Sequence, residues 1–483
     1  MPFSRKFRNL ISALDSLRLS RRWSVRMGYR DVLSLCVPLV ASTLASSAMM
    51  FTDRLFLSRY SLDCIAAALP SGIMKFTLTA FFFGTVTYTG VFAAQYTGAG
   101  NPRRAAASLW QGLYLSLFFG IGLYSLYFLG PWIFSLTGHP EDIQGLEVLY
   151  FRVLILGSPV ELMMVTMSSY LSSVGRARAV MWVNFAGTAL NVPLDYLLIF
   201  GVEIGGAELI PPLGILGAAA ATVFSWFFSF LLLSLLVFSG SMERTHGTRG
   251  SRRLEWSLMR RIMRYGYPSG FQFLMEIVAF AFFAVAAGKL GSEVLAANNM
   301  VLSVESMLYI PMLGVGQAVS ILTGQSIGRG APLEGRAATV SGIAITSAYV
   351  STFLLIFVSL SGPIISVFMP EAEDAAVKAR IIALATVLLR FVVLYSFFDG
   401  LYICCFGALK GAGDVWYPMW AMALWGAAMI AGQVALFLTG AATIYTLWAV
   451  LVSYVLALTF TAYWRFRSGK WLSARVIEPA LEA

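Results

Sequence analysis

The sequence predicts an all-α polytopic membrane protein with twelve transmembrane helices in two pseudo-symmetric six-helix lobes. Its composition is the first reason: 58% of the 483 residues are hydrophobic and 12% are charged, whereas soluble domains carry about 25% charged residues. Apolar runs of about 20 residues, the length that crosses a bilayer, recur from Val32 almost to the C-terminus. Finally, one long polar stretch, 239–266, separates two very apolar halves.

These patterns divide the chain into five segments. We expect a basic N-terminal segment at 1–31, a first lobe at 32–238, a basic linker at 239–266, a second lobe at 267–465 and a tail at 466–483. The apolar runs predict helices over about 32–56, 64–92, 105–130, 146–170, 179–201, 214–238, 267–290, 295–322, 338–360, 381–406, 415–438 and 444–465.

The linker indicates how the chain is oriented in the membrane. It carries seven arginines and two glutamates, and basic segments remain on the cytoplasmic side during insertion. Its last part, LEWSLMRRIMRYG, is expected to lie on that surface as an amphipathic helix. The loops at 138–147, 201–214 and 369–378 are acidic or neutral and are expected to face outward.

The distribution of basic residues argues against a nucleic-acid partner. Most of the 34 lysines and arginines lie in the terminal segments, the linker and short loops on one predicted side. The net charge of +10 therefore reports membrane topology. We expect a multi-pass protein of the cell membrane, a bacterial inner membrane, with both termini cytoplasmic and the chain a monomer in the lipid bilayer.

The two halves also repeat. A shift of 230 residues aligns Pro38 with Pro268 and Gln95 with Gln325. Six helices, a linker and six more helices form a parallel repeat, and transporters of that design hold their substrate between the lobes.

Nine of the ionisable residues within the expected helices need a particular reason, because charge in mid-bilayer costs several kcal/mol. They are Asp53, Lys75, Arg152, Glu161, Asp195, Glu276, Glu305, Arg390 and Asp399. Arg152 is near a helix end and is expected to extend toward the interface. For Glu161 and Arg390 we expect structural ion pairs.

In the first lobe, Asn191 and Asp195 are four residues apart, so an amide and a carboxylate project from one helix face. Pro193 between them frees a backbone carbonyl. Together with Asp53 at the end of the first helix, they could hold Na⁺ through oxygen ligands or share a proton. The alternative is that these acids only bridge helices. Arg54, next to Asp53, could neutralise it.

In the second lobe, Glu276 lies in the first helix and Asp399 in the fourth, with Tyr395 one turn before Asp399 on the same face. The repeat also makes Lys75 and Glu305 equivalent, with opposite charges. They could pair across the two lobes as a latch; pairing of each within its own lobe is the alternative.

Four stretches resemble the multidrug and toxic compound extrusion (MATE) family of transporters, and the resemblance covers about Val32 to Arg465. They are MMFTDRLFLSRYSLDCIAAALP, PLGILGAAAATV, AANNMVLSVESMLYIPMLGVGQAVSILTGQSIGRG and CFGALKGAGDVWYPM. The family implies export of small organic, often cationic compounds, driven by H⁺ or Na⁺, through alternating access of two six-helix lobes.

Carried over by motif, the family's first-lobe cation site corresponds to Asp53, Asn191, Asp195 and Thr222. A second-lobe site, found in another branch of the family, corresponds to Glu276, Tyr395 and Asp399. Since acids are present in both lobes, the resemblance does not choose between them. Arg54 departs from the small residue expected after the helix 1 acid.

Other classes fit less well. A lipid or lipid-linked saccharide flippase of the same superfamily would favour more than twelve helices or a basic central cavity. A membrane enzyme is disfavoured because there is no metal-ligand cluster, nucleophile motif or Gly-rich phosphate loop. No cofactor is therefore expected beyond the coupling ion. A receptor or scaffold would leave the intramembrane acids without a role.

Overall fold

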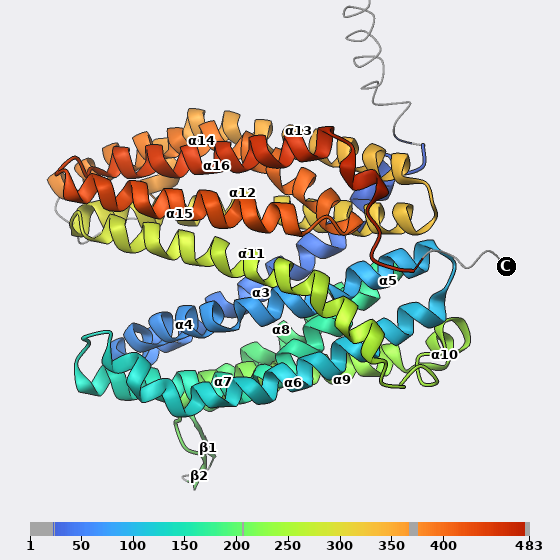
Figure 1. The fold of residues 1–483 in the computed structure, drawn as a ribbon. Helices are drawn as coiled ribbons and strands as arrows, with labels where there is room; N and C mark the ends of the chain where they lie inside the picture. The colour runs from blue at the N-terminus through green and yellow to red at the C-terminus, as the bar shows by residue number, and fades with distance from the viewer. Residues whose placement is uncertain (1–22, 24, 205–206, 367–374, 479–483) are drawn as a thin grey trace, which may run out of the picture. The chain divides into compact units, whose positions relative to one another are not determined.

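The computed structural model describes residues 23, 25–204, 207–366 and 375–478. The basic residues before Trp23, most of the predicted outward loop at 369–378, and the end of the tail lie outside the described residues. Helices account for almost all of the described chain (Figure 1), and the predicted all-α polytopic membrane fold is confirmed.

Twelve long helices occur in the described part, all close to their predicted positions. They are α3 (Tyr29–Tyr60), α4 (Leu62–Thr87) with its continuation α5 (Thr89–Gly98), α6 (Pro102–Ser135), α7 (Glu141–Leu171), α8 (Ala177–Phe200), α9 (Ile215–Val237), α11 (Trp256–Gly288), α12 (Ser292–Gly328), α13 (Pro332–Ser366), α14 (Ala375–Ala412), α15 (Trp416–Leu438) and α16 (Ile444–Arg467). Length and hydropathy give eleven candidate membrane spans, one of which, Glu141–Phe200, contains both α7 and α8.

Shorter elements complete the described chain. A kinked segment, Ser172–Arg176, joins α7 to α8: the backbone leaves helical geometry at Val174 and Gly175, and Gly175 adopts φ +87°, a conformation that glycine tolerates best. Helix α10 (Gly240–His246) lies in the linker, and a 3₁₀ turn, Lys470–Ser473, follows α16. Strands β1 (Val202–Ile204) and β2 (Ala207–Ile210) pair antiparallel, with Glu203 opposite Glu208.

Local sequence explains where the helices begin. The Asn101 side chain accepts a hydrogen bond from the Arg104 backbone N–H, and Pro102 occupies the first turn of α6. Thr443 and Thr446 form a reciprocal capping box at the start of α16. The β1–β2 hairpin was not expected from the sequence.

Part of the linker differs from expectation. Residues 256–266 are helical, as predicted, but they form the first turns of α11 and continue without interruption into the apolar part of that helix. At Gly266, a Cβ would lie 2.8 Å from the carbonyl oxygen of Thr85, so α11 packs directly against α4 at this position.

The described chain forms two compact units, which are treated separately below. Unit 1 comprises the chain up to Val37, Phe283–Asp414 and Ala427–Arg475, and unit 2 comprises Pro38–Phe282, Val415–Gly426 and the chain from Val476. Three unit limits fall inside α3, α11 and α15, and the other two lie between α14 and α15 and in the tail. The lobe limits predicted from sequence, 32–238 and 267–465, remain predictions.

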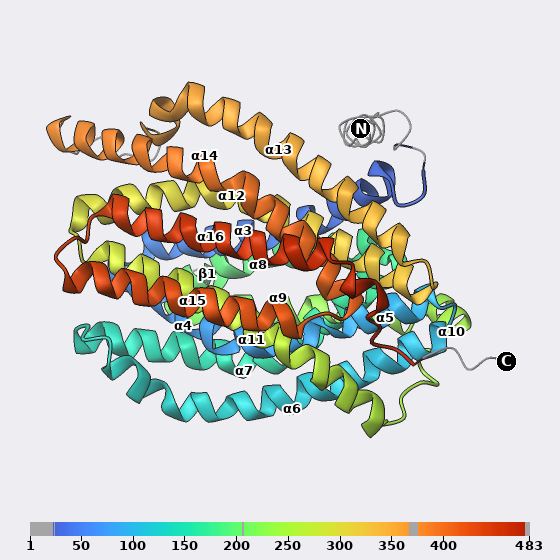
Figure 2. The ribbon, with the colours of Figure 1, turned by 45° about the horizontal axis from the view of Figure 1, so that its top comes forward.

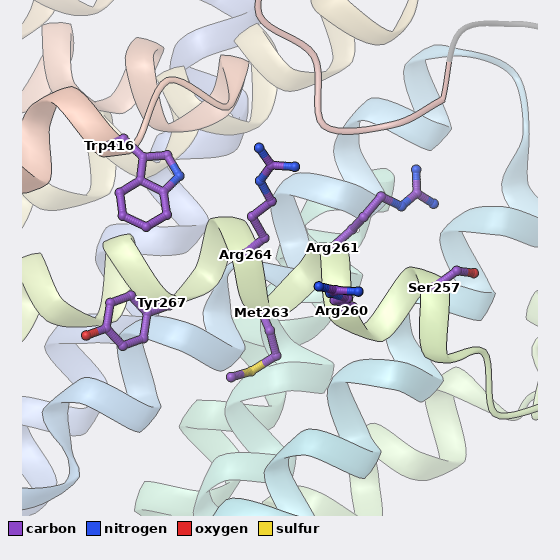
Figure 3. A pocket seen from close by; sticks show the side chains of 7 residues that line it. All are labelled: Ser257, Arg260, Arg261, Met263, Arg264, Tyr267 and Trp416. Atoms are coloured by element: carbon purple, nitrogen blue, oxygen red, sulfur yellow. The ribbon is translucent and has the colours of Figure 1, made fainter.

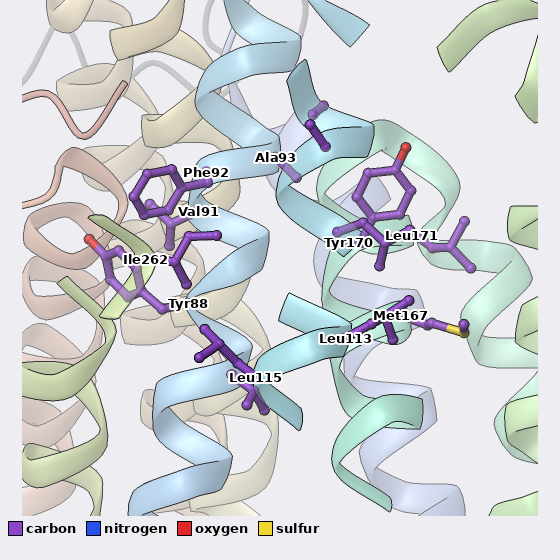
Figure 4. Close-up of a cluster of buried hydrophobic side chains, with 14 of the residues drawn as sticks. Tyr88, Val91, Phe92, Ala93, Leu113, Leu115, Met167, Tyr170, Leu171 and Ile262 are labelled. Carbon is purple, nitrogen blue, oxygen red and sulfur yellow. The ribbon is translucent and has the colours of Figure 1, made fainter. Parts of the chain in front are cut away.

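In unit 2, helix α7 packs against α4, α6 and α9 (Figure 1). A large apolar cluster fills one end of this unit (Figure 4) and includes Tyr88, Phe92, Tyr170 and Ile262. In unit 1, α14 packs against α12, α13 and α16; Figure 2 shows α13 and α14 side by side. The Trp448 indole N–H of α16 donates to Asn298 Oδ1 of α12 at 3.0 Å, and both side chains are buried.

The tail returns to unit 2 after α16. Val476 and Ile477 are buried in the apolar cluster of that unit, and the Val476 backbone N–H donates to Gln95 Oε1 at 3.0 Å. The carboxylate of Glu478 accepts from the Tyr96 hydroxyl at 2.7 Å, from Arg104 at 3.2 Å and from Arg261.

We expect the attachment of the tail to depend on pH in a defined direction. Burial alone would raise the pKa of Glu478, but the hydrogen bonds from Arg261 and Tyr96 outweigh it and lower that pKa from its ordinary value of 4.5 to about 2. The attachment is therefore fully stabilised above pH 4.5 and weakens as the pH falls toward 2. A spin label at Ser473 should become more mobile over that range.

Glu478→Gln should make the same label mobile already at pH 7, whereas Glu208→Gln, in the hairpin, should not. Equal mobility in the wild type and in Glu478→Gln at pH 7 would contradict this role of the carboxylate.

Close glycine contact sets the distance between α4 and α11. A Cβ on Gly84 would lie 2.7 Å from the Cα of Gly270, and a Cβ on Gly270 would collide with the carbonyl oxygen of Phe81. Two helix backbones can approach this closely only where both residues lack a side chain.

Gly270→Ala should therefore lower the melting temperature of the detergent-solubilised protein, because the added methyl forces α11 away from α4 at a cost of about 1–3 kcal/mol. Gly72→Ala is the matched control: no atom lies within 4 Å of a Cβ at that α4 position. It should be neutral or stabilising by about 0.5–1 kcal/mol, since alanine favours helix. Equal melting temperatures for the two variants would argue against the close contact.

Candidate functional site

Four polar side chains of the first-lobe prediction meet inside unit 2. Asp53 comes from α3, Asn191 and Asp195 from α8, and Thr222 from α9, and all four are buried. Asn191 and Asp195 project together because they are one helical turn apart. The structure thus brings together residues that are up to 169 positions apart in the chain.

Hydrogen bonds connect all four groups. The Thr222 hydroxyl donates to Asp53 Oδ2 at 3.1 Å. The Asn191 amide nitrogen, oriented by the hydrogen-bonding pattern, donates to Asp53 Oδ1 at 3.0 Å and to Asp195 Oδ2 at 3.1 Å. The two carboxyl groups lie close enough to interact directly, and a hydrogen bond between them would require one of them to carry a proton.

An apolar layer covers this site at the end that carries the β1–β2 hairpin. Leu57 lies one turn beyond Asp53, Ile199 one turn beyond Asp195, and Ala218 one turn before Thr222, and all three belong to one fully buried cluster. Tyr150 of α7 belongs to the same cluster and lies close enough to interact electrostatically with both acids. Sequence reasoning missed Tyr150, because a single tyrosine in an apolar helix carries no local signal.

Arg54 does not enter the site. Its side chain is exposed, and among the ion pairs of the described residues none joins it to Asp53. It acts on Asp53 only through space.

This arrangement has two possible chemistries. With the amide nitrogen of Asn191 between the acids, the site could hold a shared proton. If the Asn191 side-chain amide rotated by about 180°, its oxygen would join the carboxylate and hydroxyl oxygens as a ligand for a hard cation such as Na⁺. Across the described chain, no group of three or more His, Cys, Asp or Glu side chains could hold a metal ion.

The predicted second-lobe residues fall into different units. Tyr395 and Asp399 of α14 are buried in unit 1, where Tyr395 interacts with the carboxyl groups of Asp399 and of Glu305 on α12. Glu276 of α11 belongs to unit 2 and is partly buried. Glu305 is thus a neighbour of Tyr395 that the sequence did not indicate.

Lys75 has its partner within unit 2. Its ammonium group is bonded to Glu161 of α7, with 5% and 13% of the two side chains exposed, and it lies 4.6 Å from the ring centre of Trp226. The expected ion pair of Glu161 is confirmed. Lys75 and Glu305 each have a partner in their own unit, which was the alternative to the predicted latch.

Arg152 and Arg390, the two arginines considered within the expected helices, differ in their contacts. Arg152 Nε donates to the Tyr127 carbonyl oxygen at 3.1 Å, and its guanidinium lies 4.7 Å from the Tyr127 ring centre. Arg390 is exposed on α14 and forms none of the ion pairs in the described ranges. The ion pair expected for Arg390 is therefore wrong, because the side chain faces away from unit 1.

Comparison with known proteins decides the family. Residues 38–197 and 268–430, about two thirds of the chain, match the MatE family model. The chain belongs to the MATE family. MATE proteins are transporters and not enzymes, and the two matched ranges begin at Pro38 and Pro268, the prolines related by the 230-residue repeat.

Relatives and solved structures agree with this membership. The chain is 29% identical to the "Probable multidrug resistance protein NorM" of Burkholderia pseudomallei, covering 90% of this chain and 92% of that protein. It is 27% identical to "Multidrug resistance protein PmpM" of Pseudomonas aeruginosa, covering 86% of each. In fold, it is similar to an outward-facing multidrug resistance MATE transporter (TM-score 0.79, 18% identity, 91% and 95% covered) and to the eukaryotic MATE transporter AtDTX14 (0.79, 17%, 92% and 96%).

The Lys75–Glu161 pair leads to a prediction for this MATE protein. Lys75→Met should destabilise the protein by about 3–5 kcal/mol, because it leaves the Glu161 carboxylate buried and unpaired. Lys75→Met combined with Glu161→Met should recover most of that loss, measured as thermal unfolding in detergent.

Charge exchange separates this pair from the latch. Lys75→Glu with Glu161→Lys should restore stability, whereas Lys75→Glu with Glu305→Lys should not. Rescue by the Glu305 exchange alone would favour the latch.

Proposed function

We propose that this protein is a secondary antiporter that exports small organic compounds, cationic or lipophilic, in exchange for H⁺. The observation that supports this proposal best is the buried pair Asp53–Asp195. Two carboxyl groups close enough to interact directly form a site that gains or loses a proton with little rearrangement.

Protons fit the donors around this pair better than Na⁺ does. Three hydrogen bonds already reach the carboxyl oxygens, one from Thr222 and two from Asn191. Burial excludes water, so each change of protonation alters the local electrostatics strongly. Na⁺ at the same oxygens, after rotation of the Asn191 amide, is the second candidate for the coupling ion.

Relatives support the substrate class. The NorM and PmpM proteins are named for multidrug resistance, so we infer organic compounds of varied structure as cargo. A lipid or lipid-linked saccharide flippase is not favoured by these names, nor by the acidic character of the site. Alternating access of two lobes is inferred from the repeated six-helix arrangement.

Tyr395 and Asp399 in unit 1, and separately Glu276 in unit 2, are proposed as secondary contributions. The carboxyl groups of Asp399 and Glu305 both interact with Tyr395, so this region of unit 1 could also bind a cation. We assign the coupling step to the Asp53–Asp195 pair because both acids lie in one unit and accept hydrogen bonds from the same Asn191 amide.

The test is ethidium movement in proteoliposomes under an imposed pH gradient or an imposed sodium gradient. Asp195→Asn should reduce pH-driven transport at least about tenfold, since it removes a titrating group that the exchange requires. Glu276→Gln should retain more transport than Asp195→Asn.

Asp63→Asn is the matched control, because Asp63 is an exposed aspartate at the start of α4; it should transport as the wild type does. Transport that only the sodium gradient drives would show that the coupling ion is Na⁺ and not H⁺. Loss in Glu276→Gln with retention in Asp195→Asn would move the coupling step to the second-lobe acids. Absence of ethidium transport under either gradient would favour the flippase.

A further inference from the structure

A basic pocket opens beside the first turns of α11, in unit 2 and apart from the acid pair. It has a volume of about 660 Å³ and is lined by Ser257, Arg260, Arg261, Met263, Arg264, Tyr267 and Trp416. Figure 3 shows the guanidinium groups of Arg261 and Arg264 extending to the same side, with the indole of Trp416 beside Arg264. We propose that this pocket binds a phosphate group, as carried by the headgroup of an anionic phospholipid.

Helix periodicity builds the pocket. Ser257, Arg260, Arg261 and Arg264 follow the spacing i, i+3, i+4 and i+7, so they lie along one face of α11. Trp416, the first residue of α15, closes this face from a second helix. The lining is thus drawn from two helices that are distant in sequence.

Charge in the pocket is not balanced. Arg261 is paired with Glu478, but within the described chain no ion pair neutralises Arg260 or Arg264. Two free guanidinium groups four residues apart present planar sets of N–H donors, which match phosphate oxygens well.

The position along α11 points to the headgroup region. A helix of 33 residues is about 50 Å long, roughly 20 Å more than the hydrocarbon core. The polar first turns of α11 supply the excess, since the other end of the helix, FAFFAVAAG, is apolar. Tryptophan and tyrosine prefer the same depth, and Tyr267 and Trp416 are 44% and 43% exposed.

The mixed lining favours a lipid as the source of the phosphate. Met263, Tyr267 and Trp416 offer apolar and aromatic surface beside the arginines, which suits a ligand with a charged head and an apolar body. Basic pockets between helices are a known mode of binding anionic headgroups. A free phosphate would use only the arginines.

The experiment uses the purified, delipidated full chain and measures bound ligand by native mass spectrometry. Three probes are titrated: dioctanoyl phosphatidylglycerol, dioctanoyl phosphatidylcholine and inorganic phosphate. Arg260→Gln with Arg264→Gln should weaken phosphatidylglycerol binding at least about tenfold, because two charged contacts are lost. Arg252→Gln with Arg253→Gln, two exposed arginines of the same linker, removes equal charge outside the pocket and should weaken it less than about twofold.

Each outcome decides the proposal. Selective loss of phosphatidylglycerol binding in the pocket variant supports a lipid site, and selective loss of tight phosphate binding assigns the site to soluble phosphate. Equal weakening in both variants, or equal affinity for phosphatidylcholine, overturns the pocket as a phosphate site. Arg260→Lys with Arg264→Lys keeps the charge and should retain intermediate affinity, which separates ligand contact from misfolding.

Discussion

An ionised group that leaves water for the interior of a membrane costs several kcal/mol unless a partner neutralises it, and this cost shapes unit 2. The buried carboxyl groups of Asp53 and Asp195 reduce this cost by accepting hydrogen bonds from Asn191 and Thr222. Lys75 and Glu161 do so as an ion pair. Because the partners come from different helices, the hydrogen bonds and the ion pair also hold those helices together.

Helix α7 connects the Asp53–Asp195 site with the Lys75–Glu161 ion pair. Tyr150 lies close to the acids and Glu161 binds Lys75. The two residues are eleven positions apart in the sequence, about three helical turns, so both side chains lie on one face. Gly157, between them, allows α9 to approach closely, since a Cβ there would lie 2.6 Å from Val223. One face of α7 therefore provides the close contact with α9 and a residue next to each of the two polar clusters of this unit.

Much of the fold could be predicted because bilayer thickness demands helices of a minimum length, and hydropathy records that demand directly. The pairing of Asn191 with Asp195 was also accessible, since it depends on local spacing. Partners distant in the chain were not. Glu161 lies 86 residues from Lys75 and Glu478 lies 382 from Tyr96, and periodicity within one helix contains no information on which distant side chain it will meet. Exposure of Arg390 was missed for the same reason.

The apolar layer of Leu57, Ile199 and Ala218 has a consequence for how the acids exchange with their surroundings. A hydrated ion arriving from the hairpin end would have to shed its water and part a close-packed layer before reaching Asp53 or Asp195. Packing therefore insulates the pair from that compartment without any opposing charge. On that side, the barrier between the acids and the outer solution is therefore one turn of helix thick.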